Sequence, residues 1–186
     1  MTTSALLVMD VQQANTSRVC DPDYLPRLAR AVHAARDADI PVLHIVLGFR
    51  PGHPESNKRN KIFGALPAGI FTAEDPGAAI HPDIAPEPGE AIIVKRRVSA
   101  FAGSDLQLLL TAAGIDHLTL TGIATSGVVL STLRQAADLD YQLTVLADGC
   151  YDLDPDTHQF LIDKVFPRQA EITTVDDWAA ALSPTG

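Results

Sequence analysis

The chain has 186 residues, 46% hydrophobic and 20% charged, which is enough for one domain with a buried core and too short for two ordinary domains. Its net charge of -9 argues against nucleic-acid and anionic-membrane partners, which are bound mainly through Lys and Arg. No apolar run approaches the roughly 20 residues of a membrane span, and the N-terminus does not have the pattern of a signal peptide. We expect one cytoplasmic domain, residues 1–186, with a small-molecule substrate.

Strand and helix patterns alternate along the chain without an internal repeat. Short apolar runs, typical of strands buried on both faces, occur at 5–9, 41–47, 91–95, 118–121, 142–146 and 170–174. Helical patterns occupy 22–39, 104–113, 128–137, 155–166 and 176–182. This alternation predicts an α/β fold, with a mostly parallel six-stranded sheet between two layers of helices.

The segment 48–89 is the exception, because it contains seven of the 13 prolines and has no regular pattern. An irregular stretch of this length within a compact domain is usually a functional loop. We expect it to cover the site.

The stretch 118–130 reads L-T-L-T-G-I-A-T-S-G-V-V-L and passes from a strand into a helix through small residues. Such a turn presents free backbone N–H groups at the start of the helix, where developing negative charge can be held. In open α/β sheets the ligand site lies just beyond strand ends of this kind.

Two other predicted strands end in charged residues, Asp10 and Lys95. The carboxyl ends of parallel strands share one edge of the sheet, so these side chains can meet beside the turn. Burying them together costs much less than burying either alone. A structural ion pair and a functional pair both fit this spacing.

Three motifs resemble those of the isochorismatase-like hydrolases, a superfamily that includes nicotinamidases and other cysteine amidohydrolases. They are D-V-Q at 10–12, K-R-R-V-S-A-F at 95–101 and T-G-I-A-T-S-G-V-V at 121–129. The resemblance spans about 5–175 and implies a three-layer α/β domain in a homo-oligomer, a dimer or tetramer. It also implies catalytic roles for Asp10 and Lys95. In the amidohydrolase branch it places a nucleophilic Cys at the position of Val128.

Val128 is the main departure from that pattern, because valine cannot attack an amide. Cys20 lies in a predicted loop, and Cys150 is expected to be buried and inert. The isochorismatase branch, which also lacks the Cys, cleaves a vinyl ether with the Asp as general acid. For Asp10 this chemistry requires a pKa raised by burial, with Lys95 limiting the rise. That branch has an aromatic residue and a His where this chain has Ala124 and Ser126, so we do not expect isochorismate itself as substrate.

The resemblance also implies a cis peptide bond between Ile123 and Ala124, which would turn the N–H groups of Ala124 and Val128 toward the pocket as an oxyanion hole. Gly127 completes this turn. Candidate substrate contacts are Gln12, Arg50, Phe101 and Ser126.

We expect no cofactor and no metal, because His53 and His81 do not have the ligand spacing that the nicotinamidase branch uses. Two alternatives to Asp10 chemistry stay open. One is a binding or assembly protein that has lost catalysis. The other is an amidohydrolase using Ser126, a residue that also fits a helix N-cap.

Overall fold

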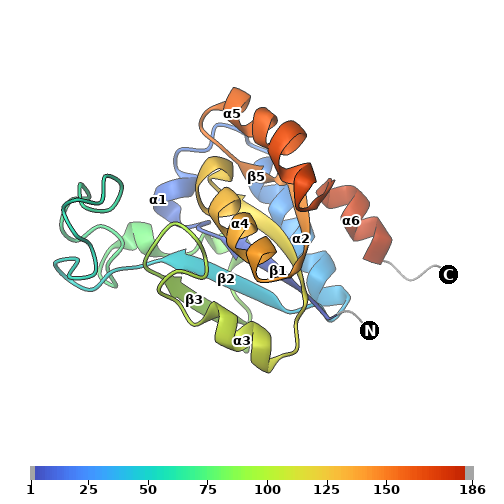
Figure 1. Cartoon of the computed structure of the whole chain (residues 1–186), viewed down its shortest axis with the longest axis horizontal. Coiled ribbons are helices and arrows are strands. Elements are labelled where there is room, and N and C mark those ends of the chain that lie inside the picture. The colour runs from blue at the N-terminus through green and yellow to red at the C-terminus, as the bar shows by residue number, and fades with distance from the viewer. Residues whose placement is uncertain (1–2, 183–186) are drawn as a thin grey trace.

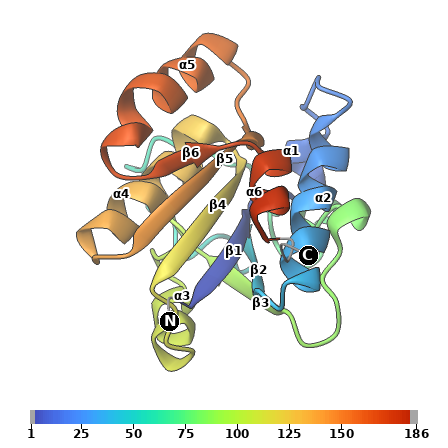
Figure 2. The same ribbon diagram turned by 90° about the vertical axis from the view of Figure 1, so that its right-hand side faces the viewer.

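The computed structural model describes residues 3–182 and is built around one sheet (Figure 1). Its six strands are all parallel, in the order β3-β2-β1-β4-β5-β6 (Figure 2). Their bounds are Ser4–Met9 for β1, Val42–Leu47 for β2, Ala91–Lys95 for β3, His117–Ile123 for β4, Gln142–Tyr151 for β5 and Glu171–Thr173 for β6. The predicted parallel sheet is confirmed.

Helices cover both faces of this sheet, as predicted (Figure 2). Helices α2 and α6 lie on one face, and α3 and α4 pack on the other. The bounds are Gln13–Thr16 for α1, Tyr24–Asp37 for α2, Leu106–Ala112 for α3, Leu130–Asp138 for α4, Pro155–Phe160 for α5 and Val175–Leu182 for α6.

The burial of the central strand β1 explains why its sequence is apolar from Ala5 to Met9. Ala5, Leu7 and Met9 belong to the core beneath α3 and α4, whereas Leu6 and Val8 belong to the core beneath α2. All five side chains are at most 2% exposed. Burying both faces leaves no position along the strand for a polar side chain until the sheet ends at Asp10.

Apart from the turn after β4, three elements differ from the predicted ones. The segment 11–21 was expected to be loop but contains α1, a single turn whose four residues are too few to show a helical period. Strand β5 continues five residues past the predicted Leu146, because after a register shift it pairs Cys150 with Gly122 and Tyr151 with Ile123. The predicted helix 155–166 breaks after α5 into a π-helical turn at Leu161–Val165 and a 3-10 turn at Phe166–Arg168, which contains Pro167.

The segment 48–89 is irregular, as predicted, and part of it projects from the rest of the molecule (Figure 1). It carries a small apolar cluster of its own, in which Phe63 and Phe71 pack with Phe49 and Leu47 from the end of β2. This cluster anchors the projecting segment at the carboxyl edge of the sheet. Among the described helices, none combines the length and apolar character that crossing a bilayer requires.

Candidate active site

Asp10 and Lys95 meet at the carboxyl edge of the sheet, where β1 and β3 end. Asp10 Oδ2 lies 2.8 Å from Lys95 Nζ, and the two residues are 7% and 1% exposed. Within residues 3–182, Asp10 Oδ1 is buried without a hydrogen-bond partner. Burial raises the pKa of the Asp10 carboxyl, and the Lys95 ammonium offsets part of that rise. The carboxyl therefore holds a proton more firmly than an exposed Asp, and its second oxygen is left without a donor in the described part of the chain.

The backbone around Asp10 fixes the direction of this carboxyl. Asp10 has a φ of 56°, a left-handed conformation that Asp tolerates better than most residues. Its N–H donates to Ile45 O at 2.8 Å, and its carbonyl accepts from Asn15 Nδ2 at 2.8 Å. The short helix α1, which sequence patterns missed, thus stabilises the conformation of Asp10.

The turn after β4 lies beside the ion pair. Gly122 has a φ of 143°, and a Cβ at this position would collide with the carbonyl oxygen of Met9. Glycine therefore lets the turn approach the residue next to Asp10. The Ile123–Ala124 peptide bond is cis, as predicted. The turn continues as a π-helical segment over Thr125–Val129 before α4, where a regular helix from Val128 was predicted.

A cavity of about 300 Å³ lies against these groups. Asp10, Lys95, Ile123, Ala124, Gly127 and Val128 line it, so six of the ten predicted site residues come together. Side chains of the projecting segment, Ile62, Phe63, Leu66 and Phe71, form another wall. The segment that we expect to cover the site thus forms part of the wall of this cavity.

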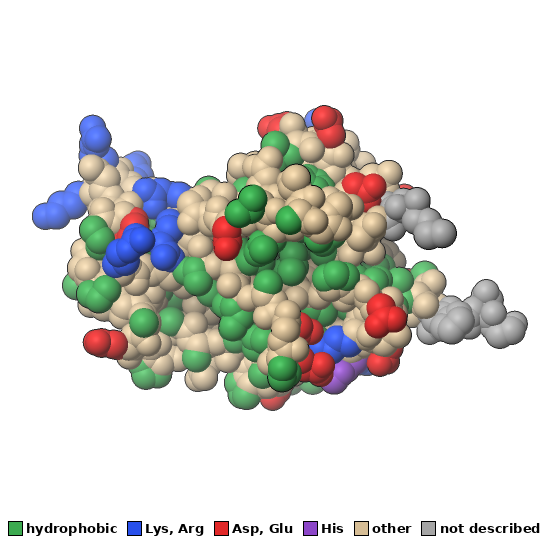
Figure 3. Space-filling model, turned by 90° about the horizontal axis from the view of Figure 1, so that it is seen from below, with side chains coloured by type: hydrophobic (Ala, Val, Ile, Leu, Met, Phe, Trp, Pro, Cys, Tyr) green, Lys and Arg blue, Asp and Glu red, His purple; other side chains and the backbone are tan. Residues whose placement is uncertain are grey.

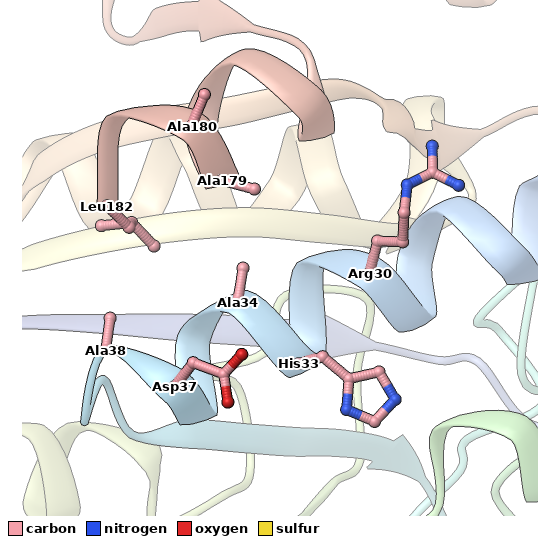
Figure 4. Close-up of a pocket in the computed structure, with 8 residues that line it drawn as sticks. All are labelled: Arg30, His33, Ala34, Asp37, Ala38, Ala179, Ala180 and Leu182. Carbon is pink, nitrogen blue, oxygen red and sulfur yellow. The ribbon is translucent and has the colours of Figure 1, made fainter. Parts of the chain in front are cut away.

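A larger cavity, about 560 Å³, is elsewhere, between α2 and α6 (Figure 4). Four of the eight residues drawn there are alanines, and Arg30, His33 and Asp37 come from the exposed side of α2. It contains none of the predicted site residues. The smaller cavity, with its buried carboxyl, is therefore the candidate active site.

Two side chains hold the turn from its outer side, away from the cavity. Thr125 Oγ1 is 2.8 Å from His158 Nδ1. Both the backbone N–H and the hydroxyl of Ser126 donate to Asp152 Oδ2, at 2.8 and 2.6 Å. Sequence spacing could not place Asp152 and His158 here, because they reach the turn only through the extension of β5.

The other four predicted site residues do not line the cavity. Gln12 is fully buried: its amide donates to Leu47 O and Ala78 O, and its oxygen accepts from Leu47 N. Arg50 forms a surface ion pair with Glu55. Phe101 is buried and its ring lies 6.0 Å from that of Tyr141. Ser126 faces Asp152, as described above.

Neither thiol belongs to the site. Cys20 is exposed in the segment after α1, and Cys150 is buried. Burial raises the pKa of Cys150 to about 12, which leaves it protonated near neutral pH.

The two histidines considered as metal ligands have other partners. His53 Nε2 is bonded to Ile70 O, and His81 Nδ1 accepts from Asp83 N. In the part of the chain that the structure describes, no three His, Cys, Asp or Glu side chains are grouped to hold a metal ion.

Arg18 also lines the cavity, although sequence analysis did not single it out. It follows α1 in a stretch that reads as loop, so only the three-dimensional arrangement reveals it. Asn15, Leu47 and Val98 are the other lining residues that were missed.

Residues 4–177 match the family model of the isochorismatase domain. The chain belongs to the isochorismatase family. The ureidoacrylate amidohydrolase RutB of Variovorax paradoxus (strain S110) is 32% identical, over 97% of this chain and 82% of that protein. Isochorismatase family proteins of known structure include one from Burkholderia thailandensis, with 27% identity, 97% and 95% coverage and a TM-score of 0.85. Another, from Desulfovibrio vulgaris subsp. vulgaris str. Hildenborough, has 26% identity, 98% and 99% coverage and a TM-score of 0.86.

These matches extend along nearly the whole of this chain. The chain is thus an isochorismatase-family hydrolase. The expected family and fold are confirmed, and so is the expectation of a hydrolase.

Proposed function

We propose that this hydrolase cleaves a small enol ether, with Asp10 as general acid and without a covalent enzyme intermediate. The observation that carries the proposal is the buried Asp10 carboxyl, one oxygen of which meets Lys95 while the other has no partner among residues 3–182. Burial raises its pKa, so it retains a proton to higher pH than an exposed Asp.

The reaction balances with water as the only co-substrate. Protonated Asp10 gives its proton to the terminal carbon of the C=C–O group, which forms an oxocarbenium ion. Water adds to the cationic carbon and returns a proton to the Asp10 carboxylate. The resulting hemiketal breaks its C–O bond to release an alcohol and a carbonyl compound.

Lys95 and the turn have supporting roles in this proposal. Lys95 Nζ also donates to Arg97 O at 3.0 Å, which holds the ammonium in place against Asp10. Its charge stabilises the carboxylate that forms once the proton has left. The N–H groups of Ala124 and Val128 are proposed to hold the attacking water or an oxygen of the substrate, because both residues line the cavity.

The relatives named ureidoacrylate amidohydrolase favour amide hydrolysis as a second candidate function. The family resemblance places an amidohydrolase nucleophile at Val128, which is 2% exposed at the cavity wall. Ser126 is poorly placed as a substitute, since its hydroxyl donates to Asp152 and it does not line the cavity. Asp10 therefore remains the group best placed for catalysis.

Turnover of three matched probes tests this proposal: 2-methoxyacrylate, its methyl ester and 2-methoxypropanamide. Proton NMR should show methanol with pyruvate or methyl pyruvate from the first two, no hydrolysis of the amide, and no activity with Asp10→Asn. Ser126→Ala should retain turnover. Amide cleavage by the wild type, or enol ether cleavage that survives Asp10→Asn, would contradict the proposal. A protein inert toward all three probes would point to the binding-protein alternative.

A further inference from the structure

The cavity is lined by two cationic side chains, and only one of them is neutralised by the protein. Lys95 is paired with Asp10, whereas the Arg18 guanidinium has no ion-pair or hydrogen-bond partner within residues 3–182. Guanidinium groups favour carboxylates, which they bind through two parallel N–H donors.

The backbone before Arg18 is held firmly. Gln12 bonds to the end of β2 through both ends of its amide, and Asn15 Nδ2 bonds to the carbonyl of Asp10. The N–H of Arg18 in turn donates to Asn15 O at 3.1 Å. Arg18 is therefore placed relative to Asp10 by a continuous set of hydrogen bonds, rather than extending from a separate surface loop.

The nearby arginines are already engaged. Arg50 pairs with Glu55, Arg96 donates to Gly48 O, and Arg97 donates to the carbonyls of Arg96 and Glu55. These contacts hold the projecting segment and leave Arg18 as the available cation that lines the cavity in the described chain.

The first part of segment 48–89, residues 48–72, adds a positive electrostatic field beside the cavity. Residues 48–72 contain four cationic side chains, Arg50, Lys58, Arg59 and Lys61, and one carboxylate, Glu55, although the chain as a whole has a net charge of -9. Figure 3 shows Lys and Arg gathered on this projecting end, with acidic side chains scattered over the rest of the visible face. Ile62 of the same segment lines the cavity, so this field lies beside it.

We propose that Arg18 is a specificity-determining residue that binds a carboxylate of the substrate and so selects anionic over neutral substrates. The inference deepens the proposed function by naming the substrate class as small carboxylates. The substrate carboxylate binds Arg18 and anchors one end of the substrate, while its reacting group lies against the wall formed by Asp10, Val128 and the turn. The cavity of about 300 Å³ suits a compact substrate of this kind.

Binding of two inert molecules tests this selection without requiring turnover. 2-Methoxypropanoate and 3-methoxybutan-2-one have nearly the same shape, differ in charge and contain no hydrolysable bond. Ligand-observed NMR should show the anion binding at least about tenfold more tightly than the ketone. That preference should disappear in Arg18→Gln and persist in part in Arg18→Lys.

Arg59→Gln is the matched control. It removes the same charge from the projecting segment, and Arg59 does not line the cavity, so the preference should remain. Equal binding of the two molecules by the wild type, an unchanged preference in Arg18→Gln, or no detectable binding of the anion would overturn the inference. Because neither molecule is cleaved, this result is independent of whether enol ethers are hydrolysed.

Discussion

At the scale of single residues, the central feature is a charged pair placed where burial is almost complete. A buried ion pair is not strongly stabilising in itself, since its desolvation offsets much of the attraction between the charges. In the proposed reaction the pair has a chemical role, because the same desolvation raises the pKa of Asp10. Sequence identified Asp10 and Lys95 because each ends an apolar strand. It missed Arg18 and misplaced Gln12 because α1 has no pattern from which side-chain directions can be read.

Breaking the pair from one side should destabilise the fold. Asp10→Asn leaves the Lys95 ammonium 1% exposed without its counter-charge, and we expect a loss of about 3–5 kcal/mol in the free energy of unfolding. The double variant Asp10→Asn/Lys95→Met removes both charges and should recover most of that loss. Urea unfolding at pH 7 measures both. If Asp10→Asn alone is as stable as the wild type, the pair is more hydrated than its burial indicates.

At the scale of elements, side-chain contacts between distant segments hold the edges of the site. Sequence patterns located β1 and β4 well because their apolar runs are buried on both faces, and they located the edge strand β3 from its apolar composition, although Ile92 and Val94 are exposed. They could not predict the continuation of β5, which depends on pairing with β4 across a register shift. That continuation brings Asp152 and His158 behind the turn.

Removing the outer support of the turn should loosen it. Asp152→Ala deletes the acceptor for both the N–H and the hydroxyl of Ser126, which we expect to weaken local stability by about 1–3 kcal/mol. Hydrogen exchange of the amides in 125–129 should accelerate, with little change in β1. Asp156→Ala, nearby on α5, is the control and should leave those amides unaffected. Unchanged exchange rates of these amides in Asp152→Ala would show that contacts on the cavity side are sufficient to hold the turn.

A second contact between elements predicts a pH dependence of stability. Glu90 bonds with Arg36 of α2 and His44 of β2, and Arg36 is the main cause that lowers the Glu90 pKa from 4.5 to about 2. Because the folded-state pKa is depressed, this contribution is present above about pH 4.5 and is lost as the pH falls toward 2.

Glu90→Gln should therefore lower the free energy of unfolding at pH 7 by about 1–2 kcal/mol, allowing for partial solvent screening, and flatten its dependence on pH in that acidic window. Chemical denaturation across the pH range measures this. Glu87→Gln is the control, because Glu87 also contacts Arg36 but its side chain is 61% exposed. Equal losses in the two variants would contradict the assignment.

At the scale of the whole molecule, charge is distributed unevenly. An acidic protein with a cationic end should attract anionic substrates to that end, and this attraction weakens as salt screens it. We expect kcat/KM for 2-methoxyacrylate to fall with added NaCl, while the value for its neutral methyl ester changes little. Parallel salt curves for the two probes would contradict electrostatic steering.

The assembly state also belongs to this scale. The family resemblance implies a homo-oligomer, so light scattering coupled to size exclusion should give a mass of at least two chains of 19.8 kDa each. A mass of one chain at micromolar concentration would contradict that expectation. Sequence alone could not locate an interface, because an apolar run such as 91–95 does not tell which of its side chains stay exposed, as Ile92 and Val94 do.

The pH profile of kcat/KM on 2-methoxyacrylate tests the central claim most directly. If protonated Asp10 is the general acid, activity is highest below its raised pKa and falls as the pH rises through it, and Asp10→Asn abolishes the reaction at every pH. A profile that is flat or rises with pH, or an Asp10→Asn variant that retains wild-type turnover, would contradict the account.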